Sequence, residues 1–362
     1  MSDLAKHMAH ALRLGARGMG QVWPNPAVGC IIEKDGRILG RGATQAGGRP
    51  HAETVALAQA GTQAHGATAH VTLEPCAHVG HTPPCAQALI DAGIAHVSYA
   101  IDDPDPRVSG RGAAMLRAAG VQVTSGIMAD AARADHAGFL KRVTQGLPFI
   151  TLKLASSLDG RIAMASGESQ WITAPPTRAH VHGLRSLHDV VMVGSNTALA
   201  DDPQLTVRGM GAVRQPVRVV VDGGLRFGAD KQLGRSVDFA PVWLLHGQNA
   251  PMPARHAWAD AGAKLIETPL QNKQLDLRAA MAALAAQGIT RVLCEGGGGL
   301  AAALLRAGLV DQIALYTAGL AIGGAGLPSI ADLGLPNLAD APRPRLMESR
   351  QIGPDLFSLW QC

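Results

Sequence analysis

The segment TLEPCAHVGHTPPC, residues 72–85, closes one apolar run with Cys76 and opens the next helical pattern with Cys85. It predicts a strand, a loop and a helix in that order. Upstream, PHAE (residues 50–53) opens another helical pattern. One histidine and two cysteines at such positions form a three-ligand tetrahedral zinc set with a fourth position left for water. The predicted metal ligands are His51, Cys76 and Cys85.

Glu53 lies two residues after the predicted histidine ligand and is the candidate catalytic residue. Zinc lowers the pKa of a bound water to roughly 7, and Glu53 can take a proton from that water and pass it to a leaving amine. The H-x-E … P-C … C arrangement is typical of zinc deaminases that act on amino-pyrimidines and purines. The alternative is a purely structural zinc site formed by Cys76, His78, His81 and Cys85, which leaves the PHAE segment unexplained. Cys30, inside an apolar run, is interpreted as a small buried hydrophobic residue rather than a ligand.

Length and composition limit the number of domains, the fold class and the possible binding partners. At roughly 150 residues per domain, 362 residues indicate two domains. With 47% hydrophobic and 17% charged residues, the chain is not a disordered tail. Only 3% of residues are aromatic and 43 are glycine, which favours an α/β enzyme over a β-sandwich. The net charge of +4 is too small and too scattered for an electrostatic nucleic-acid binder.

Apolar runs alternate with helical patterns along the whole chain. In the first half, we predict strands at 27–33, 37–42, 69–73 and 96–101, with helices at 51–64 and 84–92. The Gly146-Leu147-Pro148 break is the predicted domain boundary, which gives domains 1–146 and 147–362. In the second half, we predict strands at 149–155, 189–193, 217–221, 242–245, 291–294 and 312–316, with helices at 175–187, 276–287 and 300–307. This alternation predicts mainly parallel sheets with helices on their faces.

The start of the chain and its cysteines predict a cytoplasmic protein. Asp3 and Lys6 lie where a secretory signal would need an apolar core. No run of 18 apolar residues predicts a membrane span. Five cysteines, an odd number in a chain without an export signal, favour reduced thiols or metal ligands over a disulfide framework.

Four segments of the first half together resemble the deaminase half of the bifunctional riboflavin-biosynthesis deaminase–reductases. They are WPNPAVG (23–29), PHAE (50–53), TLEPC (72–76) and GHTPPC (80–85). Eight residues separate the two cysteines, unlike the two that are typical of cytidine and tRNA-adenosine deaminases. The resemblance implies a cytidine-deaminase-like α/β/α domain, Glu53 as the proton shuttle and Asn25 beside the bound pyrimidine. A turn residue between two prolines is the alternative for Asn25.

The second half carries a second set of motifs: LKLASSLDGR (152–161), SGESQWIT (166–173), VGSNT (193–197), LADDPQLTVR (199–208) and CEGGGG (294–299). Glycines at a helix N-terminus let phosphate oxygens approach free backbone N–H groups. The last motif is not the G-x-G-x-x-G fingerprint and comes late in the domain, which argues against a standard dinucleotide unit; taken alone, it could be a flexible loop. Together the motifs resemble the reductase half of the same enzymes, with a dihydrofolate-reductase-like α/β fold and NADPH as cofactor.

The resemblance also implies residue roles in the second half. The implied NADPH contacts are Ala155, Trp171, Thr197, Asp201, Gly297, Gly298, Gly299, Leu300, Ala301, Ala302 and Ala303. The implied substrate contacts are Ser169, Arg185, Leu205, Arg208 and Glu295. The guanidinium groups of Arg185 and Arg208 are suited to a ribose phosphate, because their planar N–H groups can form paired hydrogen bonds with its oxygens. For Lys153, proton transfer to the sugar and a structural ion pair both stay open, and Asp201 could also assist proton transfer. The preference for NADPH over NADH follows from the resemblance alone, because no single residue identifies a 2′-phosphate pocket.

The predicted function is therefore two consecutive reactions on phosphorylated pyrimidines, in a homo-oligomer that needs neither nucleic acid nor a membrane. The first is zinc-dependent hydrolytic deamination of 2,5-diamino-6-ribosylamino-4(3H)-pyrimidinone 5′-phosphate. The second is NADPH-dependent reduction of the ribosyl chain of 5-amino-6-(5-phosphoribosylamino)uracil to ribityl. One alternative is a nucleic-acid editing deaminase, which needs a basic groove or a stacking platform. Another is a scaffold protein that is stabilised by zinc and senses NADP but catalyses no reaction. In such a protein, Glu53→Ala would change only local stability.

Overall fold

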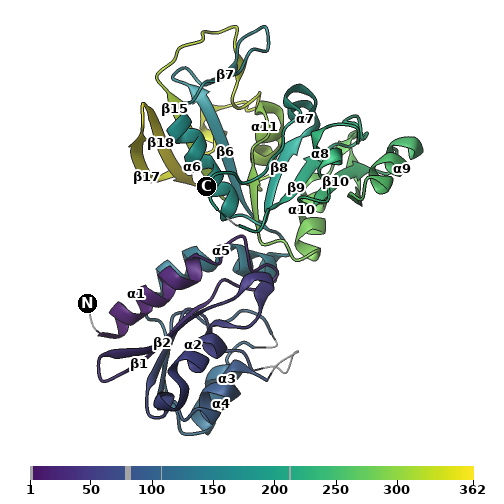
Figure 1. Cartoon of the computed structure of the whole chain (residues 1–362). Coiled ribbons are helices and arrows are strands. Elements are labelled where there is room, and N and C mark those ends of the chain that lie inside the picture. Colours follow the sequence, from purple (N-terminus) through teal and green to yellow (C-terminus); the bar gives the residue numbers. More distant parts are fainter. Residues whose placement is uncertain (1–2, 78–82, 107, 212) are drawn as a thin grey trace. The chain divides into compact units, whose positions relative to one another are not determined.

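The computed structural model describes residues 3–77, 83–106, 108–211 and 213–362. The chain divides into two compact units, Met1–Gly146 and Leu147–Cys362. Each unit is built around its own β-sheet, as Figure 1 shows, and each is described below by itself.

The first unit contains a five-stranded sheet with the strand order β2-β1-β3-β4-β5. Strand β1 pairs antiparallel with both β2 and β3, whereas β3, β4 and β5 are parallel. Two of the four pairings are therefore parallel, fewer than in the predicted mainly parallel sheet, because the Asp35-Gly36 turn forms the β1–β2 hairpin and β3 also runs antiparallel to β1. The strands are β1 (Gly29–Lys34), β2 (Arg37–Ala43), β3 (Thr68–Val71), β4 (His96–Tyr99) and β5 (Gln122–Thr124).

Two glycines show that helices cover both faces of this sheet. A Cβ on Gly29 would lie 1.8 Å from the carbonyl oxygen of Ala11 in α1 (Asp3–Ala16). A Cβ on Gly42 would lie 1.9 Å from the carbonyl oxygen of Ala52 in α2 (Ala52–Ala60). Gly42 pairs with Cys30, so it faces the side opposite to Gly29. The first unit is thus the predicted α/β/α sandwich, completed by α3 (Cys85–Asp91), α4 (Arg111–Ala118) and α5 (Ala129–Gln145).

The second unit contains a nine-stranded sheet with the order β11-β10-β9-β8-β14-β6-β15-β18-β17. Figure 1 labels seven of these strands: β10, β9, β8, β6, β15, β18 and β17. Every pairing from β11 to β15 is parallel, as predicted, and β18 and β17 are antiparallel. The strands are β6 (Phe149–Ser157), β8 (Val190–Gly194), β9 (Val217–Val221), β10 (Val242–Gly247), β11 (Lys264–Thr268), β14 (Arg291–Cys294), β15 (Gln312–Ala318), β17 (Arg345–Ile352) and β18 (Asp355–Gln361).

Short elements and helices complete the described part of the second unit. Two small antiparallel ladders join β7 (Arg161–Ala163) to β16 (Leu327–Pro328) and β12 (Leu270–Gln271) to β13 (Gln274–Leu275). The helices are α6 (Pro175–Ser186), α7 (Ser195–Asp201), α8 (Gln232–Arg235), α9 (Met252–Asp260), α10 (Leu277–Ala286) and α11 (Gly298–Arg306). The elements that were not predicted from the sequence include α7, α8, α9, β11 and the β17–β18 hairpin. In β17, seven of eight residues are exposed, so no apolar alternation marks it as a strand.

Each of the two units has its own apolar core. In the first, buried residues of α1, β1 and α2 such as Met8, Ile31 and Ala56 form one cluster. In the second, Val220 of β9 and Leu244 of β10 pack with Trp258 of α9. Across the described residues, no helix is both long and apolar enough to cross a membrane.

Candidate active sites

The three predicted metal ligands of the first unit lie together. His51 is the N-cap of α2, Cys85 is the first residue of α3, and Cys76 precedes it in the loop after β3. His51 Nδ1 lies 3.8 Å from Cys76 Sγ and 3.3 Å from Cys85 Sγ, and all three atoms lie within 4.8 Å of one another. Tetrahedral zinc with ordinary Zn–S and Zn–N bonds holds such nitrogen and sulfur atoms about 3.6 Å apart. The donor set therefore fits zinc.

The structure adds no support for the alternative zinc ligands. Within the described residues, His51, Cys76 and Cys85 form the only group of three such donors close enough to hold a metal ion. His78 and His81 of the alternative structural site lie outside the described residues. Cys30 is fully buried in β1, and burial raises the pKa of its thiol, as the interpretation of a small hydrophobic residue expects.

The two cysteines differ in the environment of their sulfur atoms. The backbone N–H of Cys85 donates to Cys76 Sγ at 3.3 Å. Hydrogen bonding to Cys85 lowers the pKa of the Cys76 thiol to about 4, although burial opposes the shift. The same contact, together with burial, raises the pKa of Cys85. Cys76 is thus ready as a thiolate, the form that binds metals.

Glu53, in the first turn of α2, is only 4% exposed. Burial, with the negative charge of Cys76 as the next cause, raises the pKa of Glu53 to about 7, and His51 partly opposes this. A carboxyl group with this pKa can both accept and release a proton near neutral pH, which is the property a general acid–base group needs.

Glu74 is a site-forming residue that the sequence analysis missed. Its buried carboxylate accepts hydrogen bonds from the backbone N–H groups of Gly110 and Ala113, each at 3.0 Å. Gly112, between them, is packed so closely that a Cβ would lie 1.9 Å from the Pro75 carbonyl oxygen. Glu74 therefore anchors the start of α4 against the backbone that carries Cys76. An acidic residue between an apolar run and a ligand cysteine is the sequence signal that could have found it.

Asn25 is tied to the loop that leads into His51. Its side-chain Nδ2 donates to the Gly48 carbonyl oxygen at 2.7 Å, and its backbone N–H donates to Val22 in a turn. The turn interpretation is therefore correct for its backbone. The side chain also fixes the backbone three residues before the metal ligand.

In the second unit, three predicted residues form one partly buried ionic cluster. Arg185 of α6 binds Glu295 with two hydrogen bonds, Nε to Oε1 at 2.6 Å and Nη2 to Oε2 at 3.0 Å. Lys153 Nζ of β6 lies 3.9 Å from Oε2 of the same carboxylate. The exposed fractions of the three side chains, Lys153, Arg185 and Glu295, are 18%, 13% and 9%.

Charge governs this cluster. Burial raises the pKa of Glu295, but the charges of Arg185 and Lys153 outweigh it and bring the pKa down to about 2. Burial lowers the pKa of Lys153, which Glu295 partly opposes. Glu295 is therefore a fixed anion, and Lys153 is a cation that releases its proton more easily than an exposed lysine does.

The remaining predicted residues of the second unit are less closely connected. Thr197 Oγ1 accepts the Gly297 N–H at 3.0 Å and so joins α7 to the start of α11. The backbone N–H of Arg208 donates to His182 Nδ1 at 3.2 Å, one helical turn before Arg185. In the described part of the chain, no hydrogen bond or ion pair links the cluster to Ser169, Trp171, Asp201 or Leu205. Ala155 is half-buried on β6, and the α11 residues range from buried Gly298, Ala301 and Ala302 to half-buried Leu300 and Ala303 and exposed Gly299.

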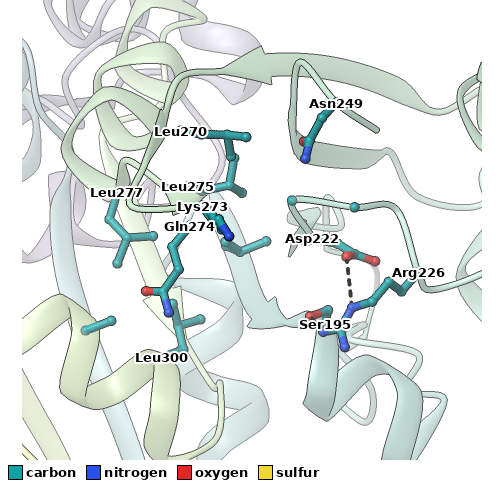
Figure 2. Close-up of a pocket in the computed structure, with 14 residues that line it drawn as sticks. Ser195, Asp222, Arg226, Asn249, Leu270, Lys273, Gln274, Leu275, Leu277 and Leu300 are labelled. Atoms are coloured by element: carbon teal, nitrogen blue, oxygen red, sulfur yellow. Dashed lines mark hydrogen bonds and ion pairs between the residues drawn. The ribbon is translucent and has the colours of Figure 1, made fainter. Parts of the chain in front are cut away.

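A cavity of about 460 Å³ lies where β8, β9 and β10 end. Leu300 and Ala303 of α11 line it, so it is continuous with the glycine-rich segment that the resemblance assigns to NADPH. Figure 2 shows the residues around it. Its polar residues, which the sequence analysis did not select, include Ser195, Asp222, Arg226 and Lys273. The Asp222-Gly223-Gly224 turn directly after a buried strand is the signal that could have found them. The carboxyl ends of parallel strands are the usual place for nucleotide cofactors, so the residues present fit a dinucleotide.

The fold and the two sites define a zinc-type nucleobase deaminase domain followed by a nucleotide-dependent reductase domain. Comparisons with known proteins agree. Residues 1–101 match the cytidine and deoxycytidylate deaminase zinc-binding region, and residues 148–358 match the RibD C-terminal domain. The riboflavin biosynthesis protein RibD of Escherichia coli is 43% identical, over 97% of this chain and 97% of that protein. The RibD of Haemophilus influenzae is 42% identical, over 96% and 95% of the two chains.

Solved structures extend the likeness to three dimensions. RibD of Acinetobacter baumannii matches with a TM-score of 0.89 and 39% identity, over 99% of this chain and 98% of that one. A Thermotoga maritima diaminohydroxyphosphoribosylaminopyrimidine deaminase/5-amino-6-(5-phosphoribosylamino)uracil reductase matches with a TM-score of 0.86 and 31% identity, with the same coverage. The chain belongs to the RibD family. It is a bifunctional deaminase and reductase of riboflavin biosynthesis, with zinc and NADPH as its cofactors.

Proposed function

We propose that residues 1–146 deaminate 2,5-diamino-6-ribosylamino-4(3H)-pyrimidinone 5′-phosphate and that residues 147–362 reduce the deaminated product. The observation that carries the proposal is the grouping of His51, Cys76 and Cys85 within 4.8 Å, with the buried Glu53 two residues from the histidine. In the second unit, the Lys153, Arg185 and Glu295 cluster is the support.

In the deaminase site, the chain's own residues bind the metal and move protons. His51, Cys76 and Cys85 would hold zinc, which when bound supplies the Lewis acidity that activates water at neutral pH. The Glu53 carboxylate accepts a proton from the attacking water and, as a carboxylic acid, returns it to the leaving amino group, so that ammonia departs. Its pKa of about 7 suits both steps. Asn25, whose side chain donates a hydrogen bond to Gly48, would contact the bound pyrimidine.

In the reductase site, the chain positions two reactants and supplies a proton. NADPH, when bound, supplies hydride for C1′ of the opened ribosyl chain. Opening the ring leaves O4′ in need of a proton, and we assign its transfer to Lys153, whose pKa burial lowers. Glu295 holds Arg185 in position with two hydrogen bonds. Ser169, Leu205 and Arg208 complete the substrate contacts, and Ala155, Trp171, Thr197, Asp201 and residues 297–303 contact the cofactor.

The test measures ammonia release from the diamino-pyrimidinone ribotide and oxidation of NADPH, with the wild-type chain and Glu53→Gln. We expect the wild-type chain to catalyse both reactions. In the variant, zinc stays bound while ammonia release falls roughly 10²- to 10⁴-fold, the usual contribution of general acid–base catalysis. When the variant receives the deaminated intermediate directly, it oxidises NADPH at the wild-type rate.

Glu33→Gln, on β1 of the same unit, is the matched control and should keep both activities. The deaminase assignment fails if the zinc-loaded wild-type chain releases no ammonia from the ribotide. The role of Glu53 fails if Glu53→Gln releases ammonia at the wild-type rate.

We also propose that the chain works in the cytoplasm as a homo-oligomer, without nucleic-acid or membrane partners. The net charge of +4 supports the absence of nucleic acid. Strand β17 forms a sheet edge with exposed Leu346 and Met347, which supports self-association. Light scattering on the purified chain checks the oligomer, and a monomer over the micromolar range would contradict it.

A further inference from the structure

The cavity beside α11 has two chemically different sides. Figure 2 shows Leu270, Leu277 and Leu300 on one side, together with Lys273 and Gln274, and Ser195, Asp222 and Arg226 on the opposite side. An apolar wall suits a flat heterocycle such as adenine, and a cation at the rim suits a phosphate. Its volume of about 460 Å³ is within the roughly 300–1,000 Å³ of small-molecule sites.

Arg226 is the cation that the structure holds most firmly at this rim. Its Nη2 donates to Ser195 Oγ at 2.5 Å and to Asn196 Oδ1 at 3.0 Å. Its Nε lies 3.8 Å from Asp222 Oδ1. Among the described residues, Nη1 makes no hydrogen bond, and the side chain is 58% exposed. The guanidinium is therefore fixed along one edge and open along another, which prepares it for a phosphate group.

Asp222 indicates which form of the dinucleotide this rim accepts. In dinucleotide sites, an acidic residue commonly binds the free ribose 2′-hydroxyl of NAD, and an arginine accommodates the 2′-phosphate of NADP. Here the Asp222 side chain is 1% exposed, and its Oδ2 accepts the Phe227 N–H at 2.8 Å. Its Oδ1 is buried and makes no hydrogen bond, with Arg226 as its charged neighbour. The Asp222 carboxylate is turned inward and positions Arg226, whose guanidinium is left exposed at the rim of the cavity.

Lys273 adds a second positive charge to the same cavity. It lies in the β12–β13 turn, where both Asn272 and Lys273 have positive φ values of 51° and 64°. Within the described residues, its ammonium group makes no hydrogen bond or ion pair. The cavity therefore carries two cations and one neutralising carboxylate.

We infer that Arg226, positioned by Ser195, Asn196 and Asp222, binds the 2′-phosphate of the adenosine half of the dinucleotide, with Lys273 as the second cation. This pair sets the preference for NADPH over NADH. The inference rests on the proposed reductase function of residues 147–362 and adds the residues that select its cofactor.

The test is calorimetric binding to the full-length chain. Adenosine 2′,5′-bisphosphate and adenosine 5′-phosphate differ only in the 2′-phosphate, and NADPH and NADH differ in the same group. In Arg226→Gln, we expect Kd to rise roughly 10- to 100-fold for NADPH and for the bisphosphate, because a charge-assisted hydrogen-bond pair is lost. Binding of NADH and of adenosine 5′-phosphate stays unchanged. Arg235→Gln, which removes an exposed arginine of α8 outside the cavity lining, leaves all four values unchanged.

Two further variants keep the test independent of folding. Arg226→Lys keeps the charge without the planar fork, so its loss should fall between wild type and Arg226→Gln. Lys273→Gln should weaken only the two 2′-phosphorylated ligands, and by less. The inference is overturned if Arg226→Gln weakens both members of each pair equally, or if the wild-type chain does not discriminate between them. A wild-type chain that binds neither NADPH nor NADH would instead overturn the reductase function, and the inference with it.

Discussion

Two buried glutamates, Glu53 in the first unit and Glu295 in the second, have pKa values shifted in opposite directions. Burial raises both, but Glu53 reaches about 7 beside the Cys76 anion, whereas Arg185 and Lys153 bring Glu295 down to about 2. The neighbouring charges therefore decide what each carboxyl group can do. Glu53 exchanges a proton near neutral pH, and Glu295 stays ionised and holds its cations in place.

The two sites also differ in how the chain assembles them. The metal set comes from residues 51–85, and each ligand lies in or next to a helix terminus or a loop. The ionic cluster joins a strand, a helix and a strand end, and Arg185 and Glu295 are 110 residues apart in sequence. The first site depends on the chemical identity of a few ligands. The second depends on balanced charges that a folded sheet brings together.

The largest effect is expected when the metal site alone is removed. In Cys76→Ser, the donor set loses its lowered-pKa thiolate, so we expect loss of bound zinc and a fall of ammonia release to background. Reduction of the deaminated intermediate by NADPH should stay at the wild-type rate. Metal analysis and the two activity assays measure this. Cys362→Ser, which alters an exposed cysteine, is the control. Parallel loss of both activities would show that the two sites are not independent.

The next largest effect is expected when the charge balance of the Glu295 cluster in the second unit is broken. Glu295→Gln leaves Arg185 and Lys153 buried without their anion, so we expect the free energy of unfolding of this unit to fall by about 3–5 kcal/mol. Urea denaturation measures it. The double variant Arg185→Gln/Glu295→Gln should regain part of the loss, because one uncompensated charge is removed.

A surface ion pair provides the control for that measurement. Glu267 is 53% exposed and lies 3.0 Å from Arg255. Glu267→Gln should therefore cost only about 0–1 kcal/mol. If Glu295→Gln costs no more than Glu267→Gln, the cluster is not the charge-balanced element described above.

The same contrast explains what the sequence could predict. The metal set and Glu53 are predictable because zinc chemistry restricts the ligand types and local motifs fix their positions. The central strands are predictable because they are apolar and β-branched. Strand β17 is not, since its residues are exposed and it is held by pairing with β18. Arg226 is not predictable either, because its position depends on Ser195, which lies 31 residues earlier and meets it only in the folded sheet.

A smaller effect tests how tightly the backbone supports Cys76. In Gly112→Ala, the new Cβ would lie 1.9 Å from the Pro75 carbonyl oxygen, and the backbone before Cys76 must move. We expect a loss of about 3 kcal/mol in unfolding free energy and weaker zinc binding. Denaturation and competition with a zinc chelator measure the two quantities.

The matched control is a helical glycine with space around it. No atom lies within 4 Å of a Cβ built on Gly183 in α6, so Gly183→Ala should stabilise the second unit by about 0.5–1 kcal/mol. Equal effects of the two substitutions would contradict the close packing of Gly112 against the metal loop.

The smallest expected effect concerns a histidine that the second unit keeps neutral. His188 is 5% exposed, with Nδ1 2.7 Å from the Leu184 carbonyl oxygen and Nε2 3.0 Å from Thr151 Oγ1. Burial lowers its pKa to about 4. Between pH 6.5 and pH 4 the unfolded chain therefore binds more protons at this residue than the folded chain, so stability falls as the pH falls. From pH 7 to pH 5 the loss is about 2 kcal/mol.

His188→Gln removes this titration, so the pH dependence of unfolding free energy should be shallower in the variant by that amount. Measuring the difference between the variant and the wild-type chain at each pH cancels the acid release of zinc, which both chains share. His256→Gln, an exposed histidine of α9, should leave the wild-type slope unchanged. Equal slopes in His188→Gln and wild type would mean that His188 titrates alike in the folded and unfolded chains. The contacts around His188 would then not fix its charge state, whereas the cations around Glu295 keep that carboxyl group ionised.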